Sequence, residues 1–270
     1  MGWEMNVRVC AVASPQVVSA LGAYLDTLSD TQVSMTCVVW PSMAGSTISI
    51  PKGASVRVSG KEALASLASS GANVMLLDLL PGDDAEEYVR AALSAGLSLV
   101  NAGLQSVATD PLTYRAFRDK GLMVLGDDIL EKFSPVVFMK SIMDLIKETG
   151  VTPSSSYVLG AGGHEVDDSM RERRRSDEAS LVKGTPSFVG SVEPIDFLGD
   201  RRHYYVSVKG KGPLGSDVTL DLAIKYEEIP FRAASMAEVL ALLGKGGSDL
   251  AEDPRLQGYF KRKVERGQAL

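Results

Sequence analysis

The 270-residue chain has only two cysteines, two histidines and no long apolar run. Cys10 and Cys37 lie in apolar, strand-like segments, and their spacing matches neither a disulfide framework nor a zinc site. We therefore predict that both are reduced core residues and assign no metal ligands. The N-terminal residues lack a signal-peptide pattern, and no apolar stretch is long enough to span a bilayer. We therefore expect a cytoplasmic protein without membrane contact.

A basic surface is also missing. The formal net charge is −6 and the sequence pI is about 5.1, which argues against a nucleic-acid partner. The densest basic cluster, residues 171–175, is flanked by acidic residues on both sides. This mixture is typical of a solvated, salt-bridged helix face.

The first half of the chain alternates buried strands with amphipathic helices, which predicts a parallel sheet covered on both faces. Small strands are expected within the turn-rich residues 41–60. The main predicted strands are residues 6–13, 33–40, 73–80, 97–101 and 122–125, and the predicted helices are 16–28, 61–70, 83–95 and 111–120.

The regular alternation of strands and helices ends after residue 128. A long helix is predicted at 134–149, a short strand at 156–159 and longer strands at 203–209 and 218–227. The last of these alternates, with Val218, Leu220, Leu222 and Ile224 expected to face inward. This part is predicted to be an α+β domain with an antiparallel sheet, followed by a closing helix at 233–243.

Polar residues follow three of the predicted parallel strands. Asp78 ends one, Asn101 ends the next, and Asp127 and Asp128 follow the third. Ligands bind at this carboxyl edge in open α/β sheets. The adjacent carboxylates could bind a cation or a ribose hydroxyl, or one of them could cap the next helix; the two roles are compatible.

Three motifs in the chain, AALSAGLSLVNA, LGDDI and FLGDRRHYYVSVKG, resemble the myo-inositol-1-phosphate synthase family. The resemblance implies a Rossmann-like doubly wound parallel sheet formed by residues 1–128 and 231–270. It also implies an inserted catalytic and oligomerising α+β domain at 129–230. It further implies bound NAD and a redox-neutral conversion of glucose 6-phosphate to inositol phosphate, a step of inositol and phospholipid biosynthesis.

The phosphate loop of that family is rich in glycine, whereas this chain has Ala13, Ser14 and Pro15 after its first strand. Side chains at Ala13 and Ser14 crowd the backbone that must approach the pyrophosphate, and Pro15 removes a donor. Either a modified loop still binds NAD through Ser14 and the remaining amides, or the fold has kept no dinucleotide site. The resemblance assigns Ala13, Ser14, Asp78, Asn101 and Asp127 to the cofactor.

The catalytic lysines of the family are also replaced. Aligned on its serines, the first lysine segment carries Asp177 and Leu181 at the lysine positions, with Lys183 two residues further on. The second segment has Arg202, which can hold a phosphate but cannot readily exchange a proton. We assign Asp128, Lys183 and Arg202 to catalysis by this resemblance.

We assign Arg201 and His164 to the substrate, His164 as a new site residue that the family does not carry. His164 lies in a segment where the family carries an asparagine, and a structural role for this histidine is the competing interpretation.

Two functional hypotheses follow. The first is a divergent inositol-phosphate synthase that uses NAD and a phosphorylated sugar. The second is a non-catalytic or repurposed relative that binds a phosphorylated small molecule or a protein partner. An oxidoreductase that acts on another class of substrate is a weaker third hypothesis. It too would need the glycine-rich loop that this chain lacks. We also expect a homodimer or homotetramer in which residues 218–227 pair across a two-fold axis.

Overall fold

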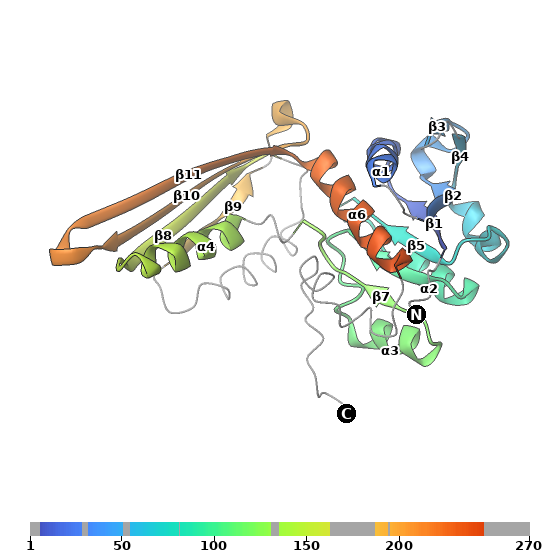
Figure 1. Ribbon diagram of the computed structural model, residues 1–270. Coiled ribbons are helices and arrows are strands. Elements are labelled where there is room, and N and C mark those ends of the chain that lie inside the picture. The colour runs from blue at the N-terminus through green and yellow to red at the C-terminus, as the bar shows by residue number, and fades with distance from the viewer. Residues whose placement is uncertain are drawn as a thin grey trace. The chain divides into compact units, whose positions relative to one another are not determined.

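The computed structural model describes residues 6–28, 32–50, 55–80, 82–130, 135–162, 187–193 and 195–245. They form two compact units: unit 1 comprises the described residues up to Leu130 and from Ile229 onward, and unit 2 comprises those between. The sequence-based boundaries fall at 128/129 and at 230/231. The chain thus leaves unit 1, builds unit 2 and returns to unit 1 with one helix (Figure 1).

Unit 1 is built on a seven-stranded sheet in the order β3-β4-β2-β1-β5-β6-β7. Neighbouring strands are parallel except the β3–β4 pair, which is antiparallel. The predicted strands are present with slightly shorter ends. The bounds are β1 Val7–Val12, β2 Val33–Val39, β3 Thr47–Ser49, β4 Ser55–Ser59, β5 Val74–Leu77, β6 Ser98–Asn101 and β7 Val124–Leu125.

Helices cover both faces of this sheet because right-handed crossovers that run in opposite directions from β1 emerge on opposite sides. One face packs with the 3-10 segment η3 and with α2 and α3 in a single apolar cluster that includes Met75, Leu77 and Phe117. Val9, Ala11 and Leu76 alternate with that set and are equally buried. The helical bounds are α1 Pro15–Thr27, η1 Pro41–Met43, η3 Lys61–Ser69, α2 Glu86–Ala95, α3 Pro111–Asp119 and α6 Glu228–Gly244.

Residues 61–69 form a 3-10 helix rather than the predicted α-helix. Its serines explain the difference in part. The hydroxyls of Ser66, Ser69 and Ser70 each donate to the carbonyl oxygen three residues earlier. Such local bonds compete with the α-helical pattern.

The prediction for the cysteines is wrong: Cys10 and Cys37 form a disulfide in the structure. Parallel pairing of β1 with β2 places the two residues directly opposite each other, with their Cα atoms 4.6 Å apart. Sequence spacing gives no sign of this pairing, because the two residues become neighbours only when the sheet forms.

Unit 2 contains a four-stranded sheet in the order β11-β10-β8-β9. The strands are β8 Thr152–Ala161, β9 Ser187–Glu193, β10 Arg201–Lys211 and β11 Asp217–Glu227, with short 3-10 turns η5 Asp196–Leu198 and η6 Pro213–Gly215. The antiparallel prediction holds for β8, β10 and β11. Strand β9, which the sequence pattern does not predict, pairs in parallel with β8.

Helix α4, Pro135–Glu148, packs on one face of this sheet. The shared core includes Met139 and Met143 from the helix and Val158, Val206 and Val208 from the strands. Three of the four β11 residues expected to face inward, Val218, Leu222 and Ile224, pack against this core. The fourth, Leu220, remains 38% exposed.

Candidate functional site

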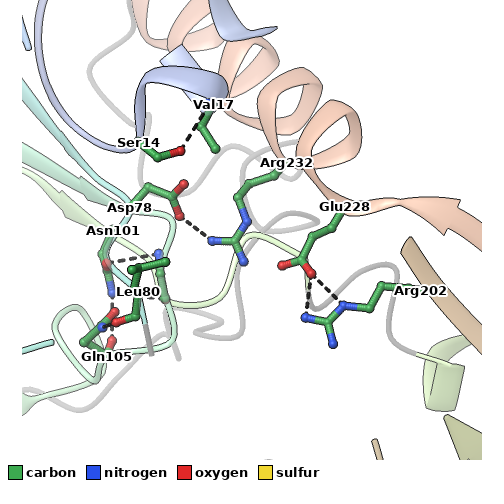
Figure 2. A network of polar contacts seen from close by, with 10 residues as sticks. Ser14, Val17, Asp78, Leu80, Asn101, Gln105, Arg202, Glu228 and Arg232 are labelled. Atoms are coloured by element: carbon green, nitrogen blue, oxygen red, sulfur yellow. Dashed lines mark hydrogen bonds and ion pairs between the residues drawn. The ribbon is translucent and has the colours of Figure 1, made fainter. Parts of the chain in front are cut away.

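The candidate site of unit 1 lies where the strand order reverses. The chain runs from β1 to β2 and β4 on one side, then returns to β5, β6 and β7 on the other side of β1. In doubly wound folds the ligand crevice opens at this switch point, at the carboxyl ends of the strands. Ser14 follows β1 and Asp78 follows β5 at this edge (Figure 2).

The turn from β1 into α1 is built to start a helix. Ala13 is completely buried. Ser14 has extended backbone angles, and its hydroxyl accepts the N–H of Val17 at 3.4 Å, so it is the N-cap of α1. Pro15 follows as the first helical residue and has no N–H to offer.

This turn by itself does not fit a pyrophosphate in the way that a glycine-rich loop does. The cap already engages one helix N–H, proline removes another, and two side chains stand where glycines would allow close approach. Beyond β2, the chain continues as Trp40-Pro41-Ser42-Met43. It therefore lacks, at the end of that strand, the carboxylate that binds ribose in many dinucleotide folds.

Asp78 is only 6% exposed and forms an ion pair with Arg232 of α6 (Figure 2). The sequence predicts Asp78 at this edge but gives no sign of Arg232, a lone arginine in the closing helix. The pairing places one positive and one negative group directly at the switch point.

Asn101 organises the next strand end. It is fully buried, and its amide nitrogen Nδ2 donates to the carbonyl oxygen of Gln105 and to the carboxylate of Asp127, both at 2.7 Å. The side chain of Gln105 donates in turn to the carbonyl oxygen of Leu80 at 2.9 Å. The segments that follow β5, β6 and β7 are therefore linked by side-chain amides.

Asp127 is an acceptor for the segment that precedes α3. Its carboxylate receives the N–H groups of Val107, Ala108 and Thr109 at 2.9–3.2 Å and the hydroxyl of Thr109 at 2.6 Å. Capping of the next helix is one role that the sequence allows for Asp127, and these contacts do not correspond to that role. The carboxylate instead fixes a loop on the neighbouring strand.

Asp128 sits beside it in the left-handed region, with a φ of 55°. Its N–H donates to the carbonyl oxygen of Gly103 at 2.8 Å, and the residue is only 7% exposed. Gly126 must lack a side chain, because a Cβ would lie 2.8 Å from the carbonyl oxygen of Asn101. The Gly-Asp-Asp motif is therefore pressed closely against the end of β6.

In unit 2, Arg202 is buried and paired within its own unit. Its Nε and Nη2 lie 2.6 and 2.5 Å from the carboxylate of Glu228, and Nη1 donates to the carbonyl oxygen of Gly162 at 2.7 Å. Burial raises the pKa of nearby Tyr226 well above its ordinary value, and Tyr204 and Glu228 add to this effect. Arg201, next along the strand, is exposed.

Two predicted residues, Lys183 and His164, lie outside the described residues, as do the charged segment 166–180 and the tail 248–270. Within the described ranges, no cluster of three or more histidine, cysteine, aspartate or glutamate side chains could hold a metal ion. None of the helices in those ranges has both the length and the apolar character needed to cross a membrane.

Comparison with known proteins relates the chain to inositol-3-phosphate synthases. The enzyme of Mycolicibacterium smegmatis is 28% identical over 173 residues, which are 57% of this chain and 47% of the enzyme. The enzyme of Corynebacterium glutamicum is 25% identical over 187 residues, or 62% of this chain and 52% of the enzyme. The chain thus spans about half the length of these curated relatives. No protein-family model matches it.

Solved structures confirm the predicted fold class. A myo-inositol-1-phosphate synthase-related protein from Thermotoga maritima has a TM-score of 0.71 at 14% identity, with 89% of this chain and 87% of that chain covered. Inositol-3-phosphate synthase from Caenorhabditis elegans has a TM-score of 0.60 at 11% identity, with 92% and 76% covered. A 3-ketoreductase from Actinomadura kijaniata, solved with TDP-benzene and NADP, has a TM-score of 0.53 at 14% identity, with 94% and 95% covered.

Proposed function

We propose that this homologue of the inositol-3-phosphate synthases is an isomerase of that type, acting on a phosphorylated sugar with bound NAD. One observation carries the proposal. Asp78, Asn101, Asp127 and Asp128 are all at most 7% exposed and follow three neighbouring strands at the switch-point edge. Burial of so many polar groups is costly, and such groups gather where a fold binds its ligand.

The proposed roles follow from the chemistry of each side chain. Asn101 and Asp128 would line the nicotinamide end of the cofactor, where bound NAD supplies hydride transfer to and from the sugar. Arg202 keeps its charge and is therefore suited to holding the sugar phosphate rather than to exchanging protons. Its pairing with Glu228 fixes the guanidinium before any ligand arrives.

The second candidate is a repurposed relative that binds a phosphorylated small molecule without this reaction. The turn formed by Ala13, Ser14 and Pro15 favours it, because that turn lacks the features that seat a pyrophosphate. The arginine at position 202, where the family carries a lysine, favours it as well, because a proton-exchanging group is replaced by one that stays charged.

Native mass spectrometry of freshly purified protein separates the two candidates. An enzyme that recycles its cofactor within one turnover should release NAD when it is denatured. The protein should also convert glucose 6-phosphate to inositol phosphate. Protein that carries no NAD, fails to bind added NAD and leaves glucose 6-phosphate unchanged would rule out the synthase and leave the repurposed relative.

We further propose that the protein is a homo-oligomer in which a second copy covers the open face of the unit 2 sheet. Among the described residues, α4 covers only the opposite face. The open face presents Leu159 at 48%, Phe188 at 54% and Tyr205 at 37% exposure. The ring of Tyr157 lies beside that of Tyr205, with centroids 5.9 Å apart and the ring planes tilted by 42°. Apolar groups gathered in this way are typical of an interaction surface.

The size of this face suits a self-association. Four strands spaced about 4.8 Å apart and about 30 Å long give roughly 500–600 Å² per copy, or roughly 1,000–1,200 Å² in total. That is the lower end of specific interfaces. The charges of the face also balance, because Lys209 and Lys225 stand among Asp221 and Glu227, so a second copy meets both signs rather than one.

A further inference from the structure

The ion pair between Asp78 and Arg232 belongs entirely to unit 1 and lies at its ligand edge. The side chains of Asp78 and Arg232 are 4% and 15% exposed, so most of both charged groups has been withdrawn from water. Figure 2 shows the guanidinium reaching the carboxylate from α6. Ser14, at the start of α1, follows strand β1, which pairs with β5.

Backbone donors are scarce at this edge. In α1 the first residue is a proline, and the N–H of Val17 is engaged by the side chain of Ser14. A lone carboxylate at position 78 would repel an approaching phosphate. Arg232 neutralises that charge, and a guanidinium offers five N–H donors in a fork that matches phosphate oxygens.

An independent feature of the same edge indicates a ligand. The side-chain oxygen Oε1 of Gln105 is buried and has no hydrogen-bond partner among the described residues. Its amide nitrogen donates to the carbonyl oxygen of Leu80, two residues beyond Asp78. A buried acceptor without a donor is costly, and a ligand that carries hydroxyl or amide groups would satisfy it.

We propose that Arg232 is the phosphate-binding residue of the switch-point site and that it replaces the contacts a glycine-rich loop would make. Asp78 pairs with the guanidinium and competes with a phosphate for it. The ligand class is a phosphate ester or diphosphate with donor groups, which includes NAD. The inference rests on the proposed function for the identity of that ligand, but not for its phosphate chemistry.

A purely structural ion pair that only anchors α6 to the sheet is the competing account. The two accounts predict opposite changes in anion affinity for one variant, D78N. If Arg232 binds phosphate, Asp78→Asn removes a competing and repelling charge and strengthens anion binding. If the pair only anchors the helix, Asp78→Asn and Arg232→Gln both loosen the fold and both weaken binding.

Isothermal titration calorimetry with NAD and with inorganic pyrophosphate tests this on the full chain. The variants are R232Q, R232K and D78N, with R115Q as the matched control because Arg115 forms an exposed ion pair with Asp119 in α3. We expect R232Q to weaken both ligands about 10- to 100-fold, as for a lost charge-assisted hydrogen bond. R232K should lose less affinity than R232Q, and D78N should bind both ligands more tightly than the unmodified protein. The affinity of R115Q should equal that of the unmodified protein.

Each outcome decides something. Tight NAD binding that R232Q leaves intact overturns the role of Arg232 but not the proposed function. Pyrophosphate binding that depends on Arg232, without NAD binding, supports the role and removes the cofactor from the proposed function. Absence of binding to both probes overturns both. Weaker binding in R232Q and D78N alike, with equally lowered melting temperatures, establishes the anchor instead. If R232Q does not fold, R232K and D78N carry the same comparison.

Discussion

Arg202 binds Glu228 through two nitrogens of its guanidinium, at 2.6 and 2.5 Å, with both residues less than 9% exposed. A buried charge without its partner is far more costly than the intact pair. We therefore expect R202M to lower the free energy of unfolding by about 3–5 kcal/mol. The double variant R202M/E228L should lose clearly less than the sum of its single changes. Urea denaturation followed by circular dichroism measures all three, and additive losses would contradict a coupled pair.

Asp127 is the common acceptor of four groups in the segment 107–109. We expect D127A to lower the free energy of unfolding by at least about 3 kcal/mol, because several hydrogen bonds to a charged acceptor are lost together. T109V removes only one of these bonds and should cost about 1–2 kcal/mol. Amide exchange of Val107 and Ala108 should accelerate in D127A. Equal losses in the two variants would show that Asp127 does not hold this segment.

Asp110 caps α3, and its carboxylate accepts the N–H of Thr113 at 2.8 Å. Hydrogen bonds from Thr113 lower the pKa of Asp110. A lowered pKa gives stability that is present above the ordinary pKa of aspartate and is lost as the pH falls through the lowered value. We expect D110A to cost about 1 kcal/mol at pH 7, and the difference to shrink in acid.

D110N is the matched control for that cap, because an asparagine can cap the helix without ionising. Its cost at pH 7 should be smaller than that of D110A, and both costs should shrink by a similar amount in acid, because neither variant ionises at this position. Thermal melts at pH 7 and in acid compare the three proteins, and a pH-independent cost in D110A would show that ionisation plays no part.

The disulfide between Cys10 and Cys37 joins neighbouring central strands and closes a loop of 27 residues. Closing a loop of this length stabilises a fold by about 3–4 kcal/mol in the chain-entropy model. Reduction should lower the melting temperature, and C37S should lower it to a similar value. Denatured protein that has not been reduced should take up no alkylating reagent. Two alkylated cysteines in that experiment would mean that both thiols are free.

The open face of unit 2 can be tested by placing a charge on it. L159K and F188K should each shift the molecular mass measured by light scattering from that of an oligomer to that of a monomer. L145K is the control, because Leu145 is 59% exposed on α4 rather than on that face. The Asp221 carboxylate, as a hydrogen-bond partner, raises the pKa of Tyr205 to about 12, so deprotonation of this tyrosine does not interfere below pH 10. A monomeric unmodified protein would end the proposal.

The parallel sheet could be predicted because its strands are local apolar runs. Val74–Leu77 is buried on both faces, and helices with clear apolar faces flank it. The positions of Asp78, Asn101 and Asp127 at one edge follow from the same pattern, because parallel strands end on the same side. The closing helix and the α+β pattern after residue 128 follow from local patterns too, and the family resemblance supplied the insertion of that part and the return of the helix to the first domain.

The features that could not be predicted are mainly contacts between residues that lie far apart along the chain. Strand β9 is interrupted by Gly190 and lies at the edge of its sheet beside β8, so its local pattern is weak. Arg232 has no motif around it, and its partner is far away in the sequence. The acceptor role of Asp127 toward residues 107–109 requires the tertiary fold, since a carboxylate after a strand looks the same whether it binds a ligand or a loop.

The separation of 154 residues between Asp78 and Arg232 has a consequence for synthesis on the ribosome. The sheet of unit 1 leaves the exit tunnel before Arg232 and the rest of helix α6 have been made. All of unit 2 must be translated before Arg232 emerges. The nascent chain therefore carries a first unit without its last helix while unit 2 is being made. A product that stops before α6 leaves the surface that α6 covers in unit 1 open to chaperones and proteases.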